Sequence, residues 1–319
     1  MLRSLFGFDW KKSPAHLLFL SKFLTPRGVE DFSESNSWES VLKEAPKKVI
    51  RRFFDEGMVE QASLAELLDH KYKATDLKAM LEKLGQKASG RKADLIERLI
   101  QANLDGMKQA TSGLSVLRCS EQGRVLAEQY LMQDRERRTQ LEQQTLQALR
   151  ERRFKEASEM VSAFEAQQVF PRGVGVDWKH CNSARDVEML KVMFNSRPKI
   201  LGSLTDEQMA HLRVAAGMMY LWGTSQAENW LPDNFETELV MDNDAAARMI
   251  SFHASHQFDI AQYHASGIKK VEVLATDNSC AACKKMAKRK YKLDEVPELP
   301  YEKCTSEMGC RCTIVVADF

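Results

Sequence analysis

Apolar residues recur at intervals of three and four along most of the chain, and β-branched runs are few, so the pattern predicts a mainly α-helical protein. Residues 37–56 show this spacing, and Pro46 divides them into two helices, the second of which ends at Gly57. A further helix is predicted to begin after Ser63. Ser63 and Glu66 have the spacing of a capping box, in which each side chain accepts a hydrogen bond from the other residue's backbone N–H.

Two short segments have the alternating, β-branched pattern of strands. Residues 114–119 predict a strand followed by a capped helix over 120–130, and residues 268–275 predict a second strand. The first strand and its helix resemble the end of a winged-helix domain. We therefore expect residues 1–71, an N-terminal helical region, to form a winged-helix-like domain together with residues 114–131, interrupted by an insertion.

A chain of 319 residues is long enough for two or three domains. Residues 104–172 form a charged helical region, whose runs of mixed sign are typical of solvated helix faces. A proline and two glycines near residues 170–178 predict a domain boundary. Residues 173–319 are then a C-terminal domain with helices near 205–222 and 243–265, and it ends in a cysteine-rich segment.

The overall charge excludes a globally basic nucleic-acid binder, because 46 Lys and Arg residues oppose 45 Asp and Glu residues. Any affinity for a polyanion must come from a local patch. The apolar cluster at residues 16–20 is short and bracketed by lysines, which excludes a membrane span and a typical signal peptide. We expect no membrane partner and an intracellular location, in the cytoplasm, nucleoid or nucleus.

Residues 72–103 concentrate positive charge on a predicted helical hairpin. Two amphipathic helices, residues 75–84 and 91–100, are joined by a tight basic turn, with Thr75 and Ser89 as the expected N-caps. Residues 71–103 hold eight cations against four carboxylates, a net charge of +4. Cations beside the start of the second helix would act on a phosphate together with its free backbone N–H groups.

The hairpin resembles the SAP motif, a helix-extended-helix module of chromatin-associated and DNA-repair proteins. The matching positions are Leu77-Lys78, Leu81, Gly85, Ser89-Gly90, Lys92-Ala93 and Leu95-Ile96-Glu97-Arg98-Leu99. Gln86 departs from the motif, because the family usually has an apolar residue there, and it favours a looser turn. The resemblance implies DNA binding that is weakly sequence-specific, through the basic turn and the second helix.

We expect the DNA contacts to come from Lys83, Lys87, Ser89, Gly90, Arg91, Lys92 and Arg98. The alternative is a protein-interaction adaptor, in which an ordinary basic hairpin never meets DNA.

Five of the seven cysteines crowd the last forty residues, which in a reducing compartment suggests a metal site more than disulfides. Two residues separate Cys280 from Cys283, so both sulfurs can face one tetrahedral ion. Zinc needs four ligands, and we expect Cys280, Cys283 and Cys304 to be completed by Cys310 or Cys312. Four thiolates leave no open position, which favours a structural Zn²⁺ over a catalytic one.

The arrangement of this tail resembles the C-terminal part of phage head morphogenesis proteins. A long helix precedes a strand, the Cys280-Ala-Ala-Cys283 pair, two prolines and Cys310-Arg-Cys312. That family usually has a histidine ahead of its final Cys-Arg-Cys, whereas Cys304 stands in that role here after a longer gap. The resemblance implies a shared zinc-binding substructure, so we expect a small zinc-stabilised α+β domain over residues 269–319.

The cysteine cluster is flanked by segments of opposite charge. Residues 269–292 hold eight cations against two carboxylates, a net charge of +6, whereas residues 294–319 carry a net charge of −4. Two interpretations stay open at this point. The basic segment is either a solubilising loop paired in part with its acidic neighbour, or a second phosphate-contacting surface held rigid by the metal.

Motifs of common enzymes are absent from the sequence, including the phosphate-binding loop, His-Glu-x-x-His, the nucleophile elbow and the dinucleotide fingerprint. Asp177 and Lys179 have the spacing of a metal-dependent nuclease, which is the alternative enzymatic function. His253, His256 and His264 share a predicted helix, but one helix offers them no common centre, and polar core or surface positions are favoured. A DNA-binding protein without catalysis is therefore the preferred prediction.

Overall fold

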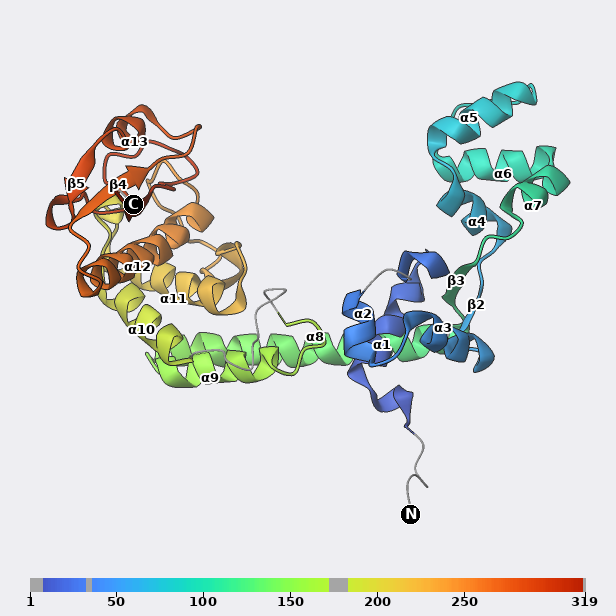
Figure 1. Ribbon diagram of the computed structural model, residues 1–319, viewed down its shortest axis with the longest axis horizontal. Helices are drawn as coiled ribbons and strands as arrows, with labels where there is room; N and C mark the ends of the chain where they lie inside the picture. The colour runs from blue at the N-terminus through green and yellow to red at the C-terminus, as the bar shows by residue number, and fades with distance from the viewer. Residues whose placement is uncertain (1–7, 33–35, 172–182, 318–319) are drawn as a thin grey trace, which may run out of the picture. The chain divides into compact units, whose positions relative to one another are not determined.

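The computed structural model describes residues 8–32, 36–171 and 183–317. The chain forms two compact units, Met1–Arg137 and Arg138–Phe319, and the boundary between them falls within the long helix α8, Glu121–Arg150. Most elements are helices, with two small antiparallel sheets, so the predicted mainly α class is confirmed (Figure 1). None of the helices in the described ranges is both long and apolar enough to cross a membrane.

The first unit begins with three helices and a three-stranded sheet. The helices are α1 (Pro14–Ser21), α2 (Asn36–Leu42) and α3 (Pro46–Asp55), with short 3₁₀ turns at Trp10–Lys12, Lys22–Leu24 and Val29–Phe32. The strands are β1 (Arg27–Gly28), β2 (Val59–Gln61) and β3 (Val116–Cys119). β3 lies between the other two and is antiparallel to both, with Val59 opposite Cys119.

Aromatic side chains dominate the core beneath this sheet. Phe19 is fully buried, and its ring centroid lies 4.7 Å from Trp38, 5.0 Å from Phe32 and 6.1 Å from Phe53. The same core includes Leu117 of β3 and residues from β2 and α8. Segments on both sides of residues 62–115 thus share one core, while the winged-helix-like assignment and the four-part domain division stay predictions.

Residues 62–115 contain four helices with a separate core. They are α4 (Leu64–Lys71), α5 (Ala74–Lys83), α6 (Lys92–Ala102) and α7 (Leu104–Thr111). Their shared buried residues are Leu68, Leu77, Leu81, Leu95, Ile96, Leu99 and Met107. α4 and α7 therefore complete the core of the α5–α6 hairpin. The predicted capping box at the start of α4 is confirmed, because Ser63 Oγ accepts the N–H of Glu66 while Glu66 accepts the N–H of Ser63.

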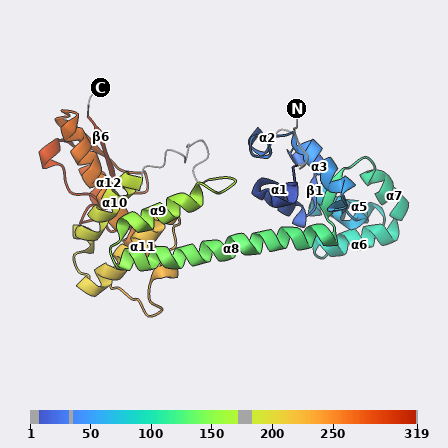
Figure 2. The ribbon, with the colours of Figure 1, turned by 90° about the horizontal axis from the view of Figure 1, so that it is seen from below.

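The second unit is built around packed helices and a methionine-rich core. After α8 the chain turns at Arg152, which has a φ of 56°, into α9 (Phe154–Glu165). α10 (Ser183–Asn195), α11 (Asp206–Trp222) and α12 (Asn243–Ala265) follow, with 3₁₀ turns at Lys199–Leu201 and Glu228–Trp230. Figure 1 and Figure 2 show α9 to α12 grouped in this unit.

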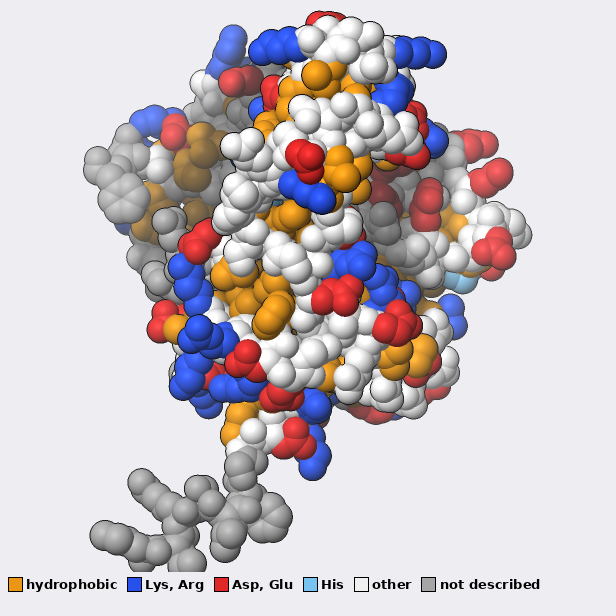
Figure 3. Space-filling view, turned by 90° about the vertical axis from the view of Figure 1, so that its right-hand side faces the viewer, with side chains coloured by type: hydrophobic (Ala, Val, Ile, Leu, Met, Phe, Trp, Pro, Cys, Tyr) orange, Lys and Arg blue, Asp and Glu red, His pale blue; other side chains and the backbone are white. Residues whose placement is uncertain are grey.

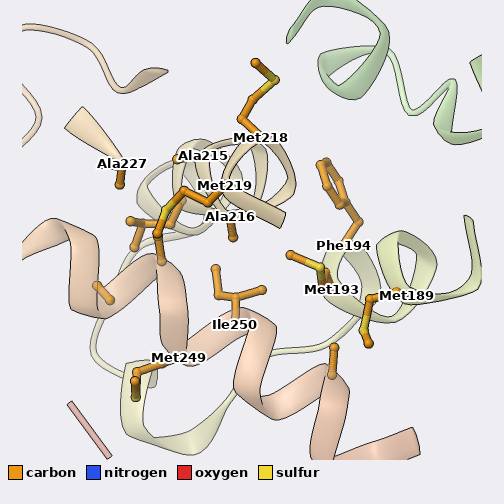
Figure 4. Packing of buried hydrophobic residues seen from close by; sticks show 14 of the residues in the cluster. Met189, Met193, Phe194, Ala215, Ala216, Met218, Met219, Ala227, Met249 and Ile250 are labelled. Carbon is orange, nitrogen blue, oxygen red and sulfur yellow. The ribbon is translucent and has the colours of Figure 1, made fainter. Parts of the chain in front are cut away.

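The core of the second unit lies between α10, α11 and α12. Figure 4 shows Ile250 of α12 between Met193 of α10 and Ala216 of α11. All three side chains are fully buried, and Trp222 is 1% exposed. Both helices that the sequence predicts here, near 205–222 and 243–265, are confirmed.

A small sheet and a short helix end the described chain. The strands are β4 (Lys270–Leu274), β5 (Lys290–Lys292) and β6 (Thr313–Val316), and β4 pairs with both others in antiparallel fashion. Helix α13 (Ala281–Met286) lies between β4 and β5, and a 3₁₀ turn covers Leu293–Glu295. The predicted strand over 268–275 is confirmed, and the segment is α+β as expected.

Candidate nucleic-acid interface and metal centre

The turn between α5 and α6 is closed by backbone hydrogen bonds. Gly85 has a φ of +64°, and the N–H of Gln86 donates to Leu81 O at 2.9 Å. This is the Schellman arrangement, in which a glycine in the left-handed region lets the chain satisfy the last helix carbonyls. Because it uses only main-chain groups, the polar side chain of Gln86 leaves the turn closed.

Arg98 braces the same turn from α6. Its guanidinium donates from Nη1 to Lys87 O and from Nη2 to Ser89 O, the latter at 2.6 Å. Gly90 has a φ of +127°, and a Cβ at this position would lie 2.9 Å from Arg98 Nη2. The hairpin therefore needs glycine at 90, and Arg98, predicted as a DNA contact, has protein partners that hold the turn.

Lys92 is also engaged within the first unit. Its Nζ donates to Asp69 O at 2.5 Å and lies 3.0 Å from Asp69 Oδ1, and its side chain is 33% exposed. Asp69 belongs to α4, outside the hairpin that the sequence delimits at 72–103. Sequence reasoning missed this partner, although the periodic apolar residue Leu68 beside it signalled that α4 continues the hairpin's core.

The expected N-caps of the hairpin are wrong. Thr75 lies inside α5, and Ser89 lies two residues ahead of the cap position of α6. α6 is instead capped from within, because Asp94 accepts the backbone N–H of Arg91 at 3.0 Å. An aspartate at the third position of α5 does the same at 3.0 Å. The carboxylate at the third position thus accepts the N–H of the cap residue, which is one half of a capping box and needs no serine or threonine at the cap.

The remaining predicted contact residues are at the surface. Lys83, Lys87, Ser89, Gly90 and Arg91 are all exposed. The side chain of Arg91 is 91% exposed and its Nε lies 3.8 Å from Asp94 Oδ2. Lys87 and Arg91 stand ahead of α6, where the first backbone N–H groups and the helix dipole favour an anion.

The surface around the hairpin is mixed in charge. Figure 3 views the side where α5 to α7 lie in Figure 1 and shows Lys and Arg side chains interspersed with carboxylates. The cations in this view therefore do not form one continuous positive surface, in keeping with the nearly neutral overall charge.

The five C-terminal cysteines converge, although they come from the start of α13 and from the segment before β6. The sulfurs of Cys280 and Cys304 lie 3.8 Å apart, and those of Cys283 and Cys310 lie 3.9 Å apart. Four thiolates at about 2.3 Å from a tetrahedral zinc would be separated by about 3.8 Å. Each distance fits an edge of such a tetrahedron, and the sulfurs form two groups of three, each with its members within 4.8 Å of one another, that could hold a metal ion.

Cys312 is the fifth thiol of the cluster. Its sulfur lies within 4.8 Å of those of Cys283 and Cys310, while Cys280 and Cys304 group with Cys283. Cys283 thus belongs to both groups. Cys310 and Cys312 are both grouped with Cys283, so each stays a candidate for the fourth ligand.

Met249 of helix α12 contacts the cysteine cluster at Cys310. The backbone N–H of Cys310 donates to Met249 Sδ at 3.2 Å. Gly309, which has a φ of +74°, approaches so closely that a Cβ there would lie 2.6 Å from Met249 Cε. The turn that presents Cys310 therefore favours glycine because of its left-handed backbone, and the Met249 side chain packs against it.

Each pair of sulfurs contains one thiol of lowered pKa. Burial would raise the pKa of Cys280, but hydrogen bonds from the N–H groups of Cys283 and Thr305 outweigh it and lower the pKa to about 6. A hydrogen bond with the Cys312 thiol, opposed by burial, lowers the pKa of Cys310 to about 5. Burial raises the pKa of Cys304 to about 11. Thiolate, the form that binds metals, is thus favoured at two positions.

Other candidate residues do not converge with this cluster. His253 and His256 are buried, and His253 Nδ1 lies 3.2 Å from Leu299 O. His264 is exposed, with Nε2 3.2 Å from Asp294 Oδ1. The nuclease-like pair Asp177 and Lys179 lies outside the described residues.

One comparison with known proteins gives a match. The family profile of the SAP domain matches residues 70–103. The SAP domain is a DNA-binding module, and this match supports a general role in binding nucleic acid. No curated protein and no solved structure matches the chain. No family evidence supports the resemblance of the cysteine-rich tail to phage head morphogenesis proteins.

Proposed function

We propose that this protein binds duplex DNA through the α5–α6 hairpin and that its C-terminal domain is stabilised by a structural Zn²⁺. The observation that carries the first part is the SAP match over residues 70–103, combined with exposed Lys87 and Arg91 ahead of α6. Phosphate oxygens would meet these two cations and the free N–H groups of the helix start together.

Contacts of this kind position a protein on DNA without reading its bases. Lys83, Lys87 and Arg91 supply charge at the exposed turn, and Ser89 and Gly90 bring the backbone close. In this proposal Arg98 and Lys92 are positioning residues, because their donors already meet Lys87 O, Ser89 O and Asp69. Binding is then weakly sequence-specific.

Zinc is the proposed metal because an all-thiolate tetrahedral set is its usual structural site. Cys280, Cys283, Cys304 and Cys310 would hold it, and the bound ion would supply cross-linking of two distant segments and no open coordination position. The ion would fix α13 against the loop that leads into β6.

The test of DNA binding compares two double variants of the full chain. Lys87→Ala/Arg91→Ala should weaken binding to unrelated duplexes by a similar factor and flatten the log–log salt slope by about 2, since each lost phosphate contact removes about 0.9. Lys47→Ala/Lys108→Ala removes the same charge from exposed positions of the first unit and should leave the slope unchanged.

Fluorescence anisotropy over a salt series measures both quantities. Equal slopes for the two variants would overturn the proposal and favour the adaptor function. A loss restricted to one DNA sequence would instead indicate that base edges are read.

A further inference from the structure

The segment from β4 to β5 carries a second concentration of positive charge, which we call the basic face. Its members are Lys269, Lys270, Lys284, Lys285, Lys288 and Arg289, with Lys290 and Lys292 on β5. All eight side chains are exposed. The net charge of residues 269–292 is +6, higher than that of the hairpin.

The acidic residues that follow do not neutralise the basic face. Asp294 pairs with His264 at 3.2 Å, and Glu298 lies 3.6 Å from Lys199 Nζ and accepts the N–H of Lys199 at 2.9 Å. Glu295 forms an ion pair with Lys292, with Oε1 2.8 Å from Nζ. Within the described ranges, the six cations named first have no carboxylate within 4.0 Å. The interpretation as a loop paired with its acidic neighbour therefore fails for most of the face.

Strand register places like charges side by side. Lys270 lies directly opposite Lys292 in the antiparallel β4–β5 pair. Like charges at such positions destabilise a sheet. Glu295 compensates Lys292, and the next register pair, Glu272 and Lys290, is of opposite charge, so within the described ranges Lys270 is the cation of β4 that is left to meet a polyanion.

Buried anchors hold the face in place. Val271 of β4 and Leu293, just after β5, are buried, and Cys283 and Met286 fix α13 to the core of the second unit. Tyr291 Oη donates to Met286 O at 3.0 Å, which joins β5 to the end of α13. The cations thus project from a backbone whose geometry is set by packing, and a rigid surface loses little conformational entropy on binding.

We propose that the basic face binds the phosphodiester backbone of DNA, as a second site separate from the hairpin. The ligand class rests on the proposed function, because a polymer held by the hairpin raises the local concentration of phosphates for any other site on the same chain. The six unpaired cations offer only hydrogen-bond donors, and phosphate oxygens are acceptors, so their chemistry fits contact with a phosphate backbone.

The experiment uses a two-by-two design on the full chain. The face variant is Lys269→Ala/Lys270→Ala/Lys288→Ala/Arg289→Ala, which leaves the neighbours of every cysteine unchanged within two residues. Its matched control, Arg150→Ala/Arg152→Ala/Lys155→Ala/Lys191→Ala, removes the same charge from exposed positions elsewhere in the second unit and leaves the Lys199–Glu298 contact in place. Each is made with and without Lys87→Ala/Arg91→Ala, and duplex binding is measured over a salt series.

The face variant should flatten the salt slope by about 3.6, at about 0.9 for each of the four contacts, in both hairpin backgrounds, and the control should not. Equal slopes for the face variant and its control overturn the inference. A loss from the face variant but none from the hairpin variant supports the basic face while overturning the hairpin proposal. A loss from the hairpin variant but none from the face variant supports the hairpin proposal and overturns the inference about the basic face.

Two further measurements keep the outcome unambiguous. Bound metal and far-ultraviolet circular dichroism must match the unchanged protein, and the corresponding glutamine variant replaces the alanine variant where they do not. Sedimentation with phosphatidylserine vesicles tests a lipid surface. Vesicle binding that depends on these four cations, with an unchanged DNA slope, overturns the inference in favour of a membrane.

Discussion

The α5–α6 hairpin and the cysteine-rich tail are both basic, yet they use their cations differently. In the hairpin, Arg98 and Lys92 donate to carbonyl oxygens and a carboxylate of the first unit. In the tail, an apolar core holds the backbone, and six cations stay unpaired within the described ranges. A count of positive residues therefore overstates the hairpin as a phosphate-binding surface and understates the tail.

The largest effect should come from removing a metal ligand. Cys280→Ala should abolish binding of about one zinc per chain and unfold the tail, since metal-binding free energy is largely folding free energy in a small site. Cys312→Ala, which removes the thiol outside the proposed tetrahedron, should keep the metal. Elemental analysis and limited proteolysis measure the two effects. Metal-free protein with an unchanged C-terminal cleavage pattern would sink the zinc proposal.

The hairpin should instead depend on its apolar core. Leu99 is fully buried, so Leu99→Ala should cost about 2–5 kcal/mol of unfolding free energy of the first unit. Leu84, which is 40% exposed, is the matched control, and Leu84→Ala should change stability by less than about 0.5 kcal/mol. Urea denaturation followed by circular dichroism compares them. Similar losses would mean that the hairpin lacks a cooperative core.

The second unit should lose stability in mild acid. Burial and the nearby His253, against Glu298, lower the pKa of His256 to about 4, below its usual 6.5. Between about pH 6.5 and pH 4, His256 is protonated in the unfolded chain but neutral in the folded chain. The free energy of unfolding therefore falls as the pH drops through this range, by roughly 3 kcal/mol in total. Thermal unfolding at pH 7 and pH 5 measures this loss. His256→Gln should reduce the difference, and an unchanged difference would contradict the assignment.

A smaller effect should separate a positioning residue from a contact residue. Arg98→Ala removes the donors to Lys87 O and Ser89 O, which water replaces in part because both bonds are exposed, and should destabilise the first unit by about 0.5–1.5 kcal/mol. Arg91→Ala should leave stability unchanged and flatten the DNA salt slope by about 0.9. Denaturation and a salt series on both variants give the comparison. Unchanged stability in Arg98→Ala would return Arg98 to the set of DNA contacts.

The sequence was informative wherever a local rule determines the structure. The capping box at Ser63, the helices over 205–222 and 243–265 and the strand over 268–275 follow from spacing and propensity alone. The hairpin's N-caps were wrong because each helix begins after a basic residue, whose N–H is accepted by an aspartate three residues further on, and a serine or threonine nearby does not mark that position.

Features that depend on distant partners could not be predicted. The donation from Lys92 to Asp69 and the close contact of Gly309 with Met249 join residues that no local pattern relates. The choice between Cys310 and Cys312 was open for the same reason, since residues two apart on an extended segment face the same way. In the structure both sulfurs lie within 4.8 Å of Cys283.

The paired strands β2 and β3 make residues 62–115 a transferable cassette. Gln61 lies opposite Leu117, and the N–H of Ala62 donates to Val116 O at 2.9 Å, so the two ends of the cassette leave the sheet side by side. Excision at these points needs only a short reverse turn to reconnect the strands, as in an ordinary β-hairpin. The same geometry lets the four helices be grafted onto another antiparallel strand pair with their own core intact.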